Sequence, residues 1–184
     1  GKTKTQADVI TYFKREGCGA KTITDSQYYD IVASARSHYN SIQKALDKIG
    51  LDADEVREIP PVYFEGFRGE NAYTKQTASG RWVSTTYEIA WLFFSDSQVH
   101  VYRRRFNLDD DYTTEITDEY FYKDITAFTT ISEEEVDRDG KRIPTTTFRM
   151  RGAGIEFECS LSEVKDFETA IRGMKQKLRE KKNA

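Results

Sequence analysis

The sequence predicts an α+β fold in which a helical N-terminal segment precedes about seven antiparallel strands and a C-terminal helix. Residues 25–49 carry apolar side chains at helical spacing, and residues 164–178 repeat that spacing near the end of the chain. Between them, residues 62–159 alternate apolar and polar side chains over short runs that end in turn residues. We therefore divide the chain into a helical segment, residues 1–58, and a β domain with its terminal helix, residues 61–184.

The helical segment is predicted to contain two helices. The first runs from Thr5 to Glu16, and the second runs from Asp25 to Ile49, with a cap at Thr24 or Asp25 and a left-handed residue at Gly50. The apolar face of the second helix follows steps of four and three residues through Tyr28, Val32, Ala35, Tyr39, Ile42, Leu46 and Ile49. The first helix is too short to cover this face, so the β domain or a second chain must help to bury it.

The β domain is predicted to begin after Pro60-Pro61, because two prolines cannot continue a helix. Polar turns separate its strands, and Asp139-Gly140 gives the strongest hairpin signal. The predicted strands are Val62–Arg68 with a hairpin continuation at Ala72–Ala78, then Trp82–Phe94, Val99–Phe106, Thr114–Tyr122, Ile125–Val136, Ile143–Arg151 and Ile155–Cys159. Tight turns favour sequential antiparallel pairing, and such a meander closes into a barrel or folds into two packed sheets.

A final helix is predicted from Leu161 to Lys181. Ser160 and Glu163 have the spacing of a capping box at its start. Its apolar stripe consists of Val164, Phe167, Ile171, Met174 and Leu178. We expect this helix to plug the open end of a partly closed barrel, where burial of five apolar side chains contributes roughly 8–15 kcal/mol before the loss of conformational entropy.

This order of elements resembles the pleckstrin-homology-like fold over about residues 61–181. Seven strands, four and then three, are followed by one amphipathic helix, and the string Tyr120-Phe121-Tyr122-Lys123-Asp124-Ile125 resembles a strand boundary of bacterial members. The resemblance implies a seven-stranded antiparallel half-barrel capped by a C-terminal helix. It also implies a binding module, because domains of this superfamily usually bind phosphoinositides, peptides or proteins.

Five basic residues are the candidates for contact with a partner. Arg68, Lys75 and Arg81 lie around the first predicted hairpin, where phosphoinositide-binding members of the superfamily place basic residues. Arg103 and Arg105 alternate on one predicted strand and therefore share a face of the sheet. The β-rich region is acidic, so inositol phosphates are not the expected ligand. Pairing of the arginine run with neighbouring acidic strands is the plainer interpretation, and a surface for an acidic partner is the alternative.

Composition excludes several classes of function. The net charge of −3 argues against nucleic-acid binding and against an anionic membrane surface, because both need clustered positive charge. The longest apolar run, Ile89–Phe94, has the length of a strand and not of a membrane span. Cys18 and Cys159 lie far apart and match no metal-binding spacing. Cys159 alternates with Phe157 and is predicted to point into the core, and two unpaired cysteines suit the reducing cytoplasm.

No group of residues in the sequence forms a recognisable catalytic constellation. His38 is expected on an exposed part of a helix and His100 on a sheet face, and the sequence brings neither of them to a nucleophile. The acidic runs 109–111 and 133–135 lack the spacing of a calcium loop and are expected at turns or strand ends. We therefore predict no catalytic residue, no cofactor and no metal.

The expected function is a non-enzymatic module that binds a protein or peptide partner. Such binding uses the open edge of a sheet or a groove between that edge and the final helix. The N-terminal helices are a further expected surface, for self-association. Two alternatives stay open: a barrel that carries a small apolar ligand in an interior cavity, and a hydrolase with two carboxylates of different pKa.

Overall fold

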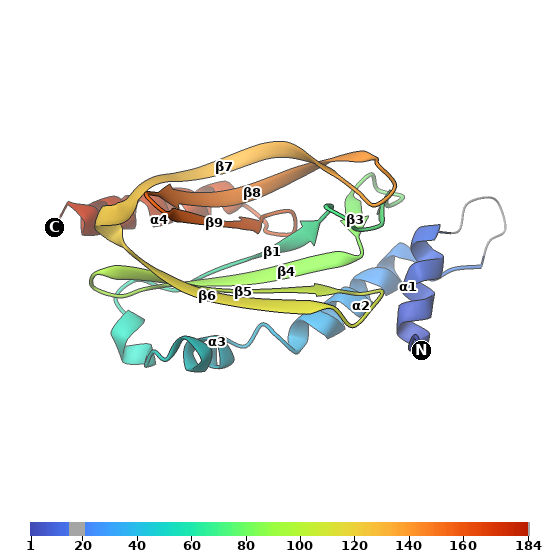
Figure 1. Cartoon of the computed structure of the whole chain (residues 1–184), viewed down its shortest axis with the longest axis horizontal. Helices are drawn as coiled ribbons and strands as arrows, with labels where there is room; N and C mark the ends of the chain where they lie inside the picture. Colours follow the sequence, from blue (N-terminus) through green and yellow to red (C-terminus); the bar gives the residue numbers. More distant parts are fainter. Residues whose placement is uncertain (15–20, 184) are drawn as a thin grey trace.

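The protein folds into three layers: helices, a four-stranded sheet and a three-stranded sheet. The structure is a computed structural model that describes residues 1–14 and 21–183. Figure 1 shows the three-stranded sheet above the four-stranded sheet, with α2 and α3 beneath the lower sheet, α1 next to α2 at its right-hand end, and α4 beside the upper sheet. The fold is therefore α+β, as the sequence predicts.

Two antiparallel sheets make up most of the β domain. The four-stranded sheet has the order β1 (Val62–Arg68), β4 (Thr86–Phe94), β5 (Gln98–Asn107) and β6 (Thr113–Phe121). The three-stranded sheet has the order β7 (Ile125–Val136), β8 (Arg142–Gly152) and β9 (Ile155–Ser160). Two short strands, β2 (Thr74–Gln76) and β3 (Trp82–Ser84), form a separate hairpin between β1 and β4. The sequence therefore places the seven main strands correctly to within two residues at most ends.

The prediction of one strand from Trp82 to Phe94 is wrong, because the ladder breaks at Thr85. The amide of Thr85 donates to Tyr73 at 3.0 Å, and its carbonyl accepts from Leu108 at 2.8 Å, so neither group pairs within the four-stranded sheet. The hydroxyl of Ser84 donates to the carbonyl of Arg68 at 2.6 Å and accepts from the amide of Thr86 at 3.2 Å, and these bonds fix this turn. The first part of the segment therefore pairs in the short hairpin and the second part in the sheet.

The N-terminal helices cover the outer face of the four-stranded sheet. They are α1 (Lys4–Lys14), α2 (Asp25–Ser37) and α3 (Ile42–Ile49), and the 3-10 turn η1 (Ala53–Val56) follows. Their buried side chains join the sheet in one core, which includes Val9, Tyr12, Tyr28, Val32, Leu46, Phe67, Tyr87, Ile89, Phe93 and Phe106. The sheet of the same chain thus buries much of the apolar face of residues 25–49, whereas Ile42 on that face is 41% exposed. The predicted C-terminal end of the first helix lies outside the described residues.

The prediction of one helix from Asp25 to Ile49 is wrong, because two helices form. The first ends at Ser37 with His38 as its C-cap, and Ser41 starts the next by accepting a hydrogen bond from the amide of Lys44. The indole nitrogen of Trp91 on β4 donates to the carbonyl of Asn40 between them, at 3.3 Å. A serine cap and a contact with the sheet thus interrupt a pattern that is continuous in the sequence.

The space between the two sheets holds the second core, and α4 (Phe167–Lys182) plugs one end of it. The side chains of Ile171, Met174 and Leu178 are buried against residues of both sheets. The helix begins six residues later than predicted, and the predicted capping box is wrong. Ser160 ends β9 and donates to the carbonyl of Phe67 at 3.0 Å, because this stretch of chain binds β1 before the helix starts.

The sandwich is closed on one side and open on the other. On the closed side, the amide of Phe67 donates to the Ser162 hydroxyl at 2.8 Å, and the amide of Glu163 donates to the carbonyl of Glu65 at 3.3 Å. On the open side, the chain passes from β6 through η2 (Tyr122–Asp124) into β7, and the two strands diverge from that corner (Figure 1). Both are the last strands of their sheets. Among residues 1–14 and 21–183, no helix is long and apolar enough to cross a membrane.

Gly66 allows the close approach of β1 to the end of β9, and Gly66→Ala tests this constraint. A Cβ at this position would lie 2.7 Å from the backbone nitrogen of Ser162, so the two segments would have to separate. We expect Gly66→Ala to lower the free energy of unfolding by about 1–3 kcal/mol in urea denaturation. The matched change Gly173→Ala, in α4 with open space around it, should raise it by about 0.5–1 kcal/mol. Equal effects of the two variants would contradict this account.

Candidate functional site

A group of charged side chains interrupts the core between the two sheets near the C-terminal end of β1. Strand register creates it, because Gly66 pairs with Glu88 and Glu88 pairs with Arg105, so these residues share the inner face of the four-stranded sheet. Arg68 lies one step along that face. The side chain of Glu88 has no exposed surface, and Arg68 is only 5% exposed. Charges this deeply buried require partners.

Both carboxylate oxygens of Glu88 have nitrogen donors next to them. Its Oε2 accepts from Nε of Arg105 at 3.0 Å, and Nη2 of Arg105 lies 3.0 Å from the same oxygen. Its Oε1 accepts from the backbone amide of Ser160 at 2.6 Å, and Nη1 of Arg68 lies 3.6 Å away. This carboxylate therefore links β4 to β5 within one sheet and to the end of β9 in the other.

Arg68 joins the two sheets through carboxylates. Its Nη2 lies 3.0 Å from Glu135 on β7 and 3.1 Å from Glu158 on β9. Glu135 also accepts from the amide of Gly69 at 3.1 Å, and Glu158 also binds Arg149 at 3.0 Å. Nη1 of Arg68 is buried but makes no hydrogen bond in the described part of the chain. One guanidinium thus balances carboxylates from three strands and keeps one nitrogen unsatisfied.

The two carboxylates on Arg68 have different pKa directions. Burial raises the pKa of Glu135, and its contact with Arg68 does not offset that effect. Burial also acts to raise the pKa of Glu158, but Arg68 and Arg149 together outweigh it, so that pKa is lowered. Glu158 has two arginine partners, whereas Glu135 has one and also lies near Glu88 and Glu70, which raise its pKa further. Structural pairing thus accounts for the difference, and this pair does not require a catalytic role.

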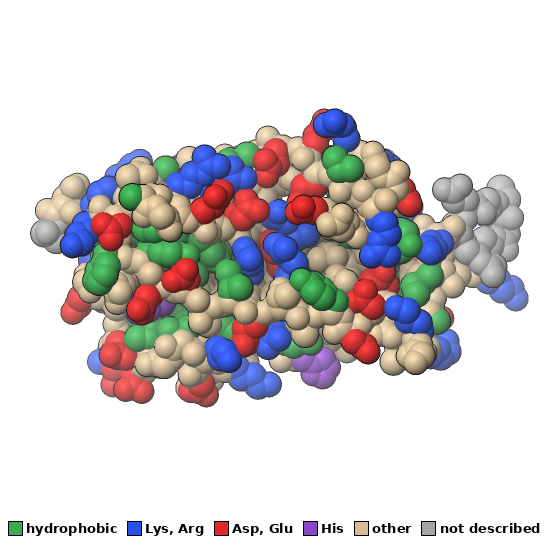
Figure 2. Space-filling view, viewed as in Figure 1, with side chains coloured by type: hydrophobic (Ala, Val, Ile, Leu, Met, Phe, Trp, Pro, Cys, Tyr) green, Lys and Arg blue, Asp and Glu red, His purple; other side chains and the backbone are tan. Residues whose placement is uncertain are grey.

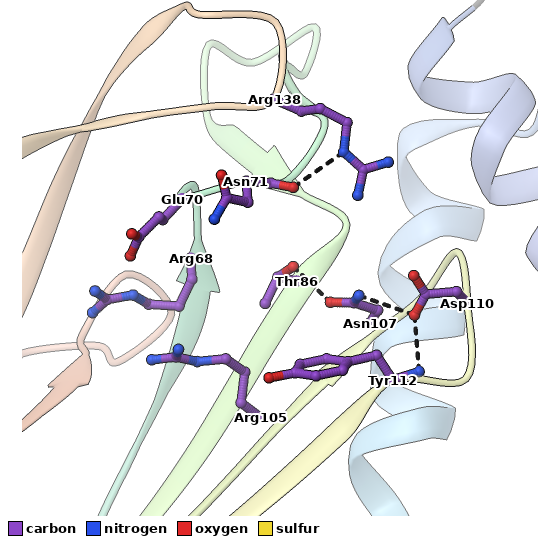
Figure 3. A pocket seen from close by; sticks show the side chains of 9 residues that line it. All are labelled: Arg68, Glu70, Asn71, Thr86, Arg105, Asn107, Asp110, Tyr112 and Arg138. Carbon is purple, nitrogen blue, oxygen red and sulfur yellow. Dashed lines mark hydrogen bonds between the residues drawn. The ribbon is translucent and has the colours of Figure 1, made fainter.

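A cavity of about 420 Å³ opens beside this cluster, and Figure 3 shows the nine side chains that line it. Three are arginines, namely Arg68, Arg105 and Arg138, and two are carboxylates, namely Glu70 and Asp110. Neutral polar side chains and one tyrosine complete the wall. The lining is therefore polar over most of its area, and two of its three arginines, Arg68 and Arg105, are already paired with Glu88.

Short hydrogen bonds fix the wall of the cavity on the side of the turn between β5 and β6. The hydroxyl of Thr86 donates to Oδ1 of Asn107 at 2.8 Å, and Nδ2 of Asn107 donates to Oδ1 of Asp110 at 2.9 Å (Figure 3). The amide of Tyr112 donates to the same oxygen of Asp110 at 2.8 Å. On the opposite side, Nε of Arg138 donates to the carbonyl of Asn71 at 3.2 Å. The wall is therefore held in place by bonds within the chain.

The structure brings together three of the five basic residues that the sequence singles out. Arg68 and Arg105 line the cavity and share Glu88. Arg103 lies one step further along β5, where Nη1 donates to the carbonyl of Glu158 at 2.6 Å. These contacts agree with the interpretation that the arginine run pairs with neighbouring strands.

The other two basic residues lie elsewhere. Lys75 donates to the carbonyl of Tyr12 in α1 at 3.2 Å, with its ammonium 4.0 Å from the centre of that ring. Arg81 pairs with Glu163 and lies 5.2 Å from the ring centre of Tyr29. Both therefore hold the helices and the segment before α4 against the β domain.

Sequence reasoning missed four members of the site: Glu88, Glu135, Glu158 and Arg138. A carboxylate in the middle of an apolar strand is the one available signal, and only Glu88 gives it. Arg138 reaches the cavity because its amide donates to the carbonyl of Ala72 at 2.8 Å and docks the β7–β8 hairpin on the loop after β1. That contact joins segments distant in the sequence, so no local pattern predicts it.

Ser95, His100 and Glu119 also meet, although the sequence does not predict this. The Ser95 hydroxyl lies 3.1 Å from Nε2 of His100, and Nδ1 of His100 lies 3.5 Å from Glu119. His100 is 4% exposed, and the Ser95 hydroxyl also donates to the carbonyl of Gln98 at 3.1 Å in the same hairpin. None of these residues lines a cavity described here. The group therefore shapes the β4–β5 turn. Cys18 lies outside the described residues.

Removal of the charge on Glu88 should be strongly destabilising. In Glu88→Gln the buried guanidiniums of Arg68 and Arg105 lose their shared carboxylate, and breaking a buried pair costs about 3–5 kcal/mol. The matched control is Glu134→Gln, whose exposed side chain lies 3.9 Å from Arg142, and which should cost less than about 0.5 kcal/mol. Urea denaturation measures both, and a loss below about 1 kcal/mol for Glu88→Gln would refute the structural role.

Stability should fall between neutral and mildly acidic pH because of His100. Burial lowers its pKa below the ordinary 6.5, although Glu119 and Glu55 act in the opposite direction. The unfolded chain therefore binds a proton that the folded chain does not, so stability decreases as the pH falls below that value. Denaturation at about pH 7 and about pH 5.5 should show a smaller loss for His100→Gln than for the unaltered chain. An identical pH dependence in both proteins would rule out this role.

Comparison with known proteins finds no relative of this chain. The chain matches no family model, no curated protein and no solved structure. The resemblance to the pleckstrin-homology-like superfamily therefore rests on the order of the elements and stays a prediction.

Proposed function

We propose that this chain is a non-enzymatic binding module that takes an extended segment of a partner protein as an added strand along β6. The observation that carries the proposal is that the outer edge of β6 has no partner strand among the described residues. The strand is nine residues long, pairs with β5 without a bulge, and has no strand on its other side in the described sheet. An edge of this kind offers a row of backbone donors and acceptors to a second chain.

Exposed hydrophobic side chains gather along this open side. Tyr112 and Phe121 flank or end β6 and are 53% and 47% exposed, and Ile116 in its middle is 38% exposed. Val136 ends β7 across the opening, and only Ile42 among the exposed large hydrophobic residues of the described chain lies elsewhere. Figure 2 shows this face with charged side chains across its middle and hydrophobic ones nearer one end. Aromatic and aliphatic anchors of this kind are typical of interfaces.

The edge has only part of the usual protection against pairing. Natural edge strands are blunted by charged side chains, above all lysine, by proline or by a bulge. Strand β6 has three acidic side chains, Glu115, Asp118 and Glu119, but no lysine, proline or bulge. Its exposed acidic residues, Asp118 and Glu119, favour a partner segment with lysine or arginine opposite them. We therefore infer a partner that alternates apolar and basic residues.

No specific observation favours either of the two alternative functions, the carrier of an apolar ligand or the carboxylate hydrolase. A carrier of an apolar ligand needs an interior apolar cavity, whereas charged and polar side chains line the space beside the inner cluster. A more apolar cavity of about 280 Å³ lies between β7 and α4, but three basic side chains line it as well. A carboxylate hydrolase needs two acids facing a cleft. Glu70 and Asp110 both line the space beside the inner cluster, but Oδ1 of Asp110 accepts from Nδ2 of Asn107 and from the amide of Tyr112. Glu135 and Glu158 are held by Arg68 and do not line it. The binding role therefore has the stronger support.

Two further proposals follow from the same features. Membership of the pleckstrin-homology-like superfamily is supported by the sheets of four and three strands and by the plug formed by α4. A cytoplasmic location is supported by the free, buried thiol of Cys159, whose pKa is raised by burial. Self-association through the N-terminal helices is less favoured, because the sheet already buries much of their apolar surface.

Selection from a displayed library of extended peptides tests the strand-addition role. Peptides enriched on the unaltered chain should slow hydrogen exchange of the β6 amides, because strand pairing removes them from water. Ile116→Lys should weaken their binding about tenfold or more, since lysine blocks edges. The matched control, Ile42→Lys, changes the same residue type at 41% exposure on α3 and should bind as the unaltered chain does.

Two results would overturn the proposal. One is enrichment of peptides whose binding leaves the exchange of the β6 amides unchanged. The other is equal loss of binding in the Ile116→Lys and Ile42→Lys variants, which would point to a general effect of added charge.

A further inference from the structure

We propose that two copies of this chain pair antiparallel along β7 and form a dimer with two-fold symmetry. This inference goes beyond strand addition at β6, and each can fail without the other because they use different edges. The observation that carries it is the distribution of charge along β7. Exposed glutamates lie near the end of the strand, whereas basic side chains of α4 lie beside its start. Antiparallel pairing of two such strands places each end of one copy against the opposite end of the other.

The outer edge of β7 is open to a second strand. Strand β7 pairs with β8 and has no strand on its other side in the described sheet. Its register shifts only at its start, between Ile125 and Ala127, so residues 127–136 form a regular ladder. The strand has no lysine or proline, and its three glutamates are confined to residues 133–135. Its first half is therefore unprotected and offers backbone donors and acceptors to another chain.

A basic groove lies beside the start of β7. A cavity of about 280 Å³ lies between residues 125–129 and α4, and Figure 1 shows α4 at the opposite end of the molecule from the β7–β8 hairpin. The charged residues of its lining are Lys175, Arg179 and Lys182, and none of the described lining residues is acidic. These three positions span about 10 Å of helix at 1.5 Å per residue. One small anion cannot contact all three, whereas a strand that runs past the helix can.

The charge of this groove is not balanced within the described chain. The ion pairs of α4 use two other lysines of the helix and involve neither Lys175 nor Arg179. The ammonium of Lys182 donates to the carbonyl of Ile125 at 2.6 Å, and a carbonyl satisfies the donor without neutralising its charge. The groove therefore suits an acidic partner segment.

The far end of β7 supplies exposed acidic side chains. Glu134 lies 3.9 Å from Arg142, and both of these side chains are exposed. Glu133 lies 3.3 Å from Arg149, but Arg149 also pairs with a second carboxylate on β9. Such exposed pairs contribute little to stability, so these glutamates can turn to a second copy at low cost.

A two-fold axis at Ile131 joins the acidic end of each copy to the groove of the other. In this register Glu134 of one copy lies opposite Phe128 of the other, and Glu133 lies opposite Thr129. Both Phe128 and Thr129 line the groove. Residues directly opposite in an antiparallel pair project from the same face, so Glu134 enters the groove from the side of Phe128. No two carboxylates face each other, and the symmetry makes each favourable contact occur twice.

Sedimentation equilibrium of the full chain over a concentration series tests for the dimer. We expect the average mass to rise from that of one chain toward that of two as the concentration increases. Over the same range, hydrogen exchange of the amides in residues 127–136 should slow, because strand pairing removes them from water.

Two charge reversals test which surfaces meet. Glu134→Lys places a lysine against the basic groove and should weaken association about tenfold or more. Lys175→Glu places a glutamate against the acidic strand end and should have a similar effect. An equal mixture of the two variants should regain association, because each contact of the mixed dimer again joins opposite charges.

Glu156→Lys and Lys177→Glu are the matched controls. Glu156 is an exposed residue of β9 that lies 3.8 Å from Arg151, an ion pair like that of Glu134 on β7. Lys177 is exposed on α4 and does not line the groove. Both control variants should associate as the unaltered chain does.

Three results would overturn the proposal. A chain that stays monomeric at about 1 mM would leave the groove to an acidic segment of a different protein. Equal weakening by Glu134→Lys and Glu156→Lys would indicate a general effect of charge. A mixture of Glu134→Lys and Lys175→Glu that associates no better than either variant alone would show that these two surfaces do not meet.

Discussion

The structure depends on one buried cation that holds the two sheets together. Arg68 ends β1 and meets Glu88 on β4, Glu135 on β7 and Glu158 on β9. Apolar side chains and α4 fill the other end of the space between the sheets, so one half of the interior of the sandwich is apolar and the other half is charged. Hydrophobic burial stabilises the apolar half, but it does not fix the orientation of one sheet on the other because it is not directional. The second half fixes the relative position of the sheets, because charges without partners at this depth would be costly.

The elements that local patterns specify are the ones that sequence reasoning predicts well. The bounds of β1 and β7 match the expected ranges, since alternation and flanking turns encode them. Errors arise where distant contacts override local signals. Ser160 bonds to Phe67 rather than capping a helix, and Trp91 binds the turn at Asn40 that interrupts the second helix.

The candidate site shows the same contrast between residues that a local pattern reveals and residues that only distant contacts bring together. Arg68 and Arg105 could be singled out because basic residues on strands are conspicuous in an acidic domain. Their partners could not, because Glu135 and Glu158 look like ordinary charges on strand ends and reach Arg68 only through the packing of one sheet on the other. The cavity also needs Arg138, which the docking of a hairpin brings into place.

The central strands of the four-stranded sheet are buried on both faces, and this has a consequence for how the molecule unfolds. Strand β4 sends alternate residues into two different cores: Ile89 and Phe93 pack under the helices, and Ala90 and Leu92 pack against the second sheet. Loss of either outer layer would leave half of the central strands in contact with water. The helical segment and the β sandwich are therefore thermodynamically coupled, and they should melt as one cooperative unit despite the clear boundary between them in the sequence.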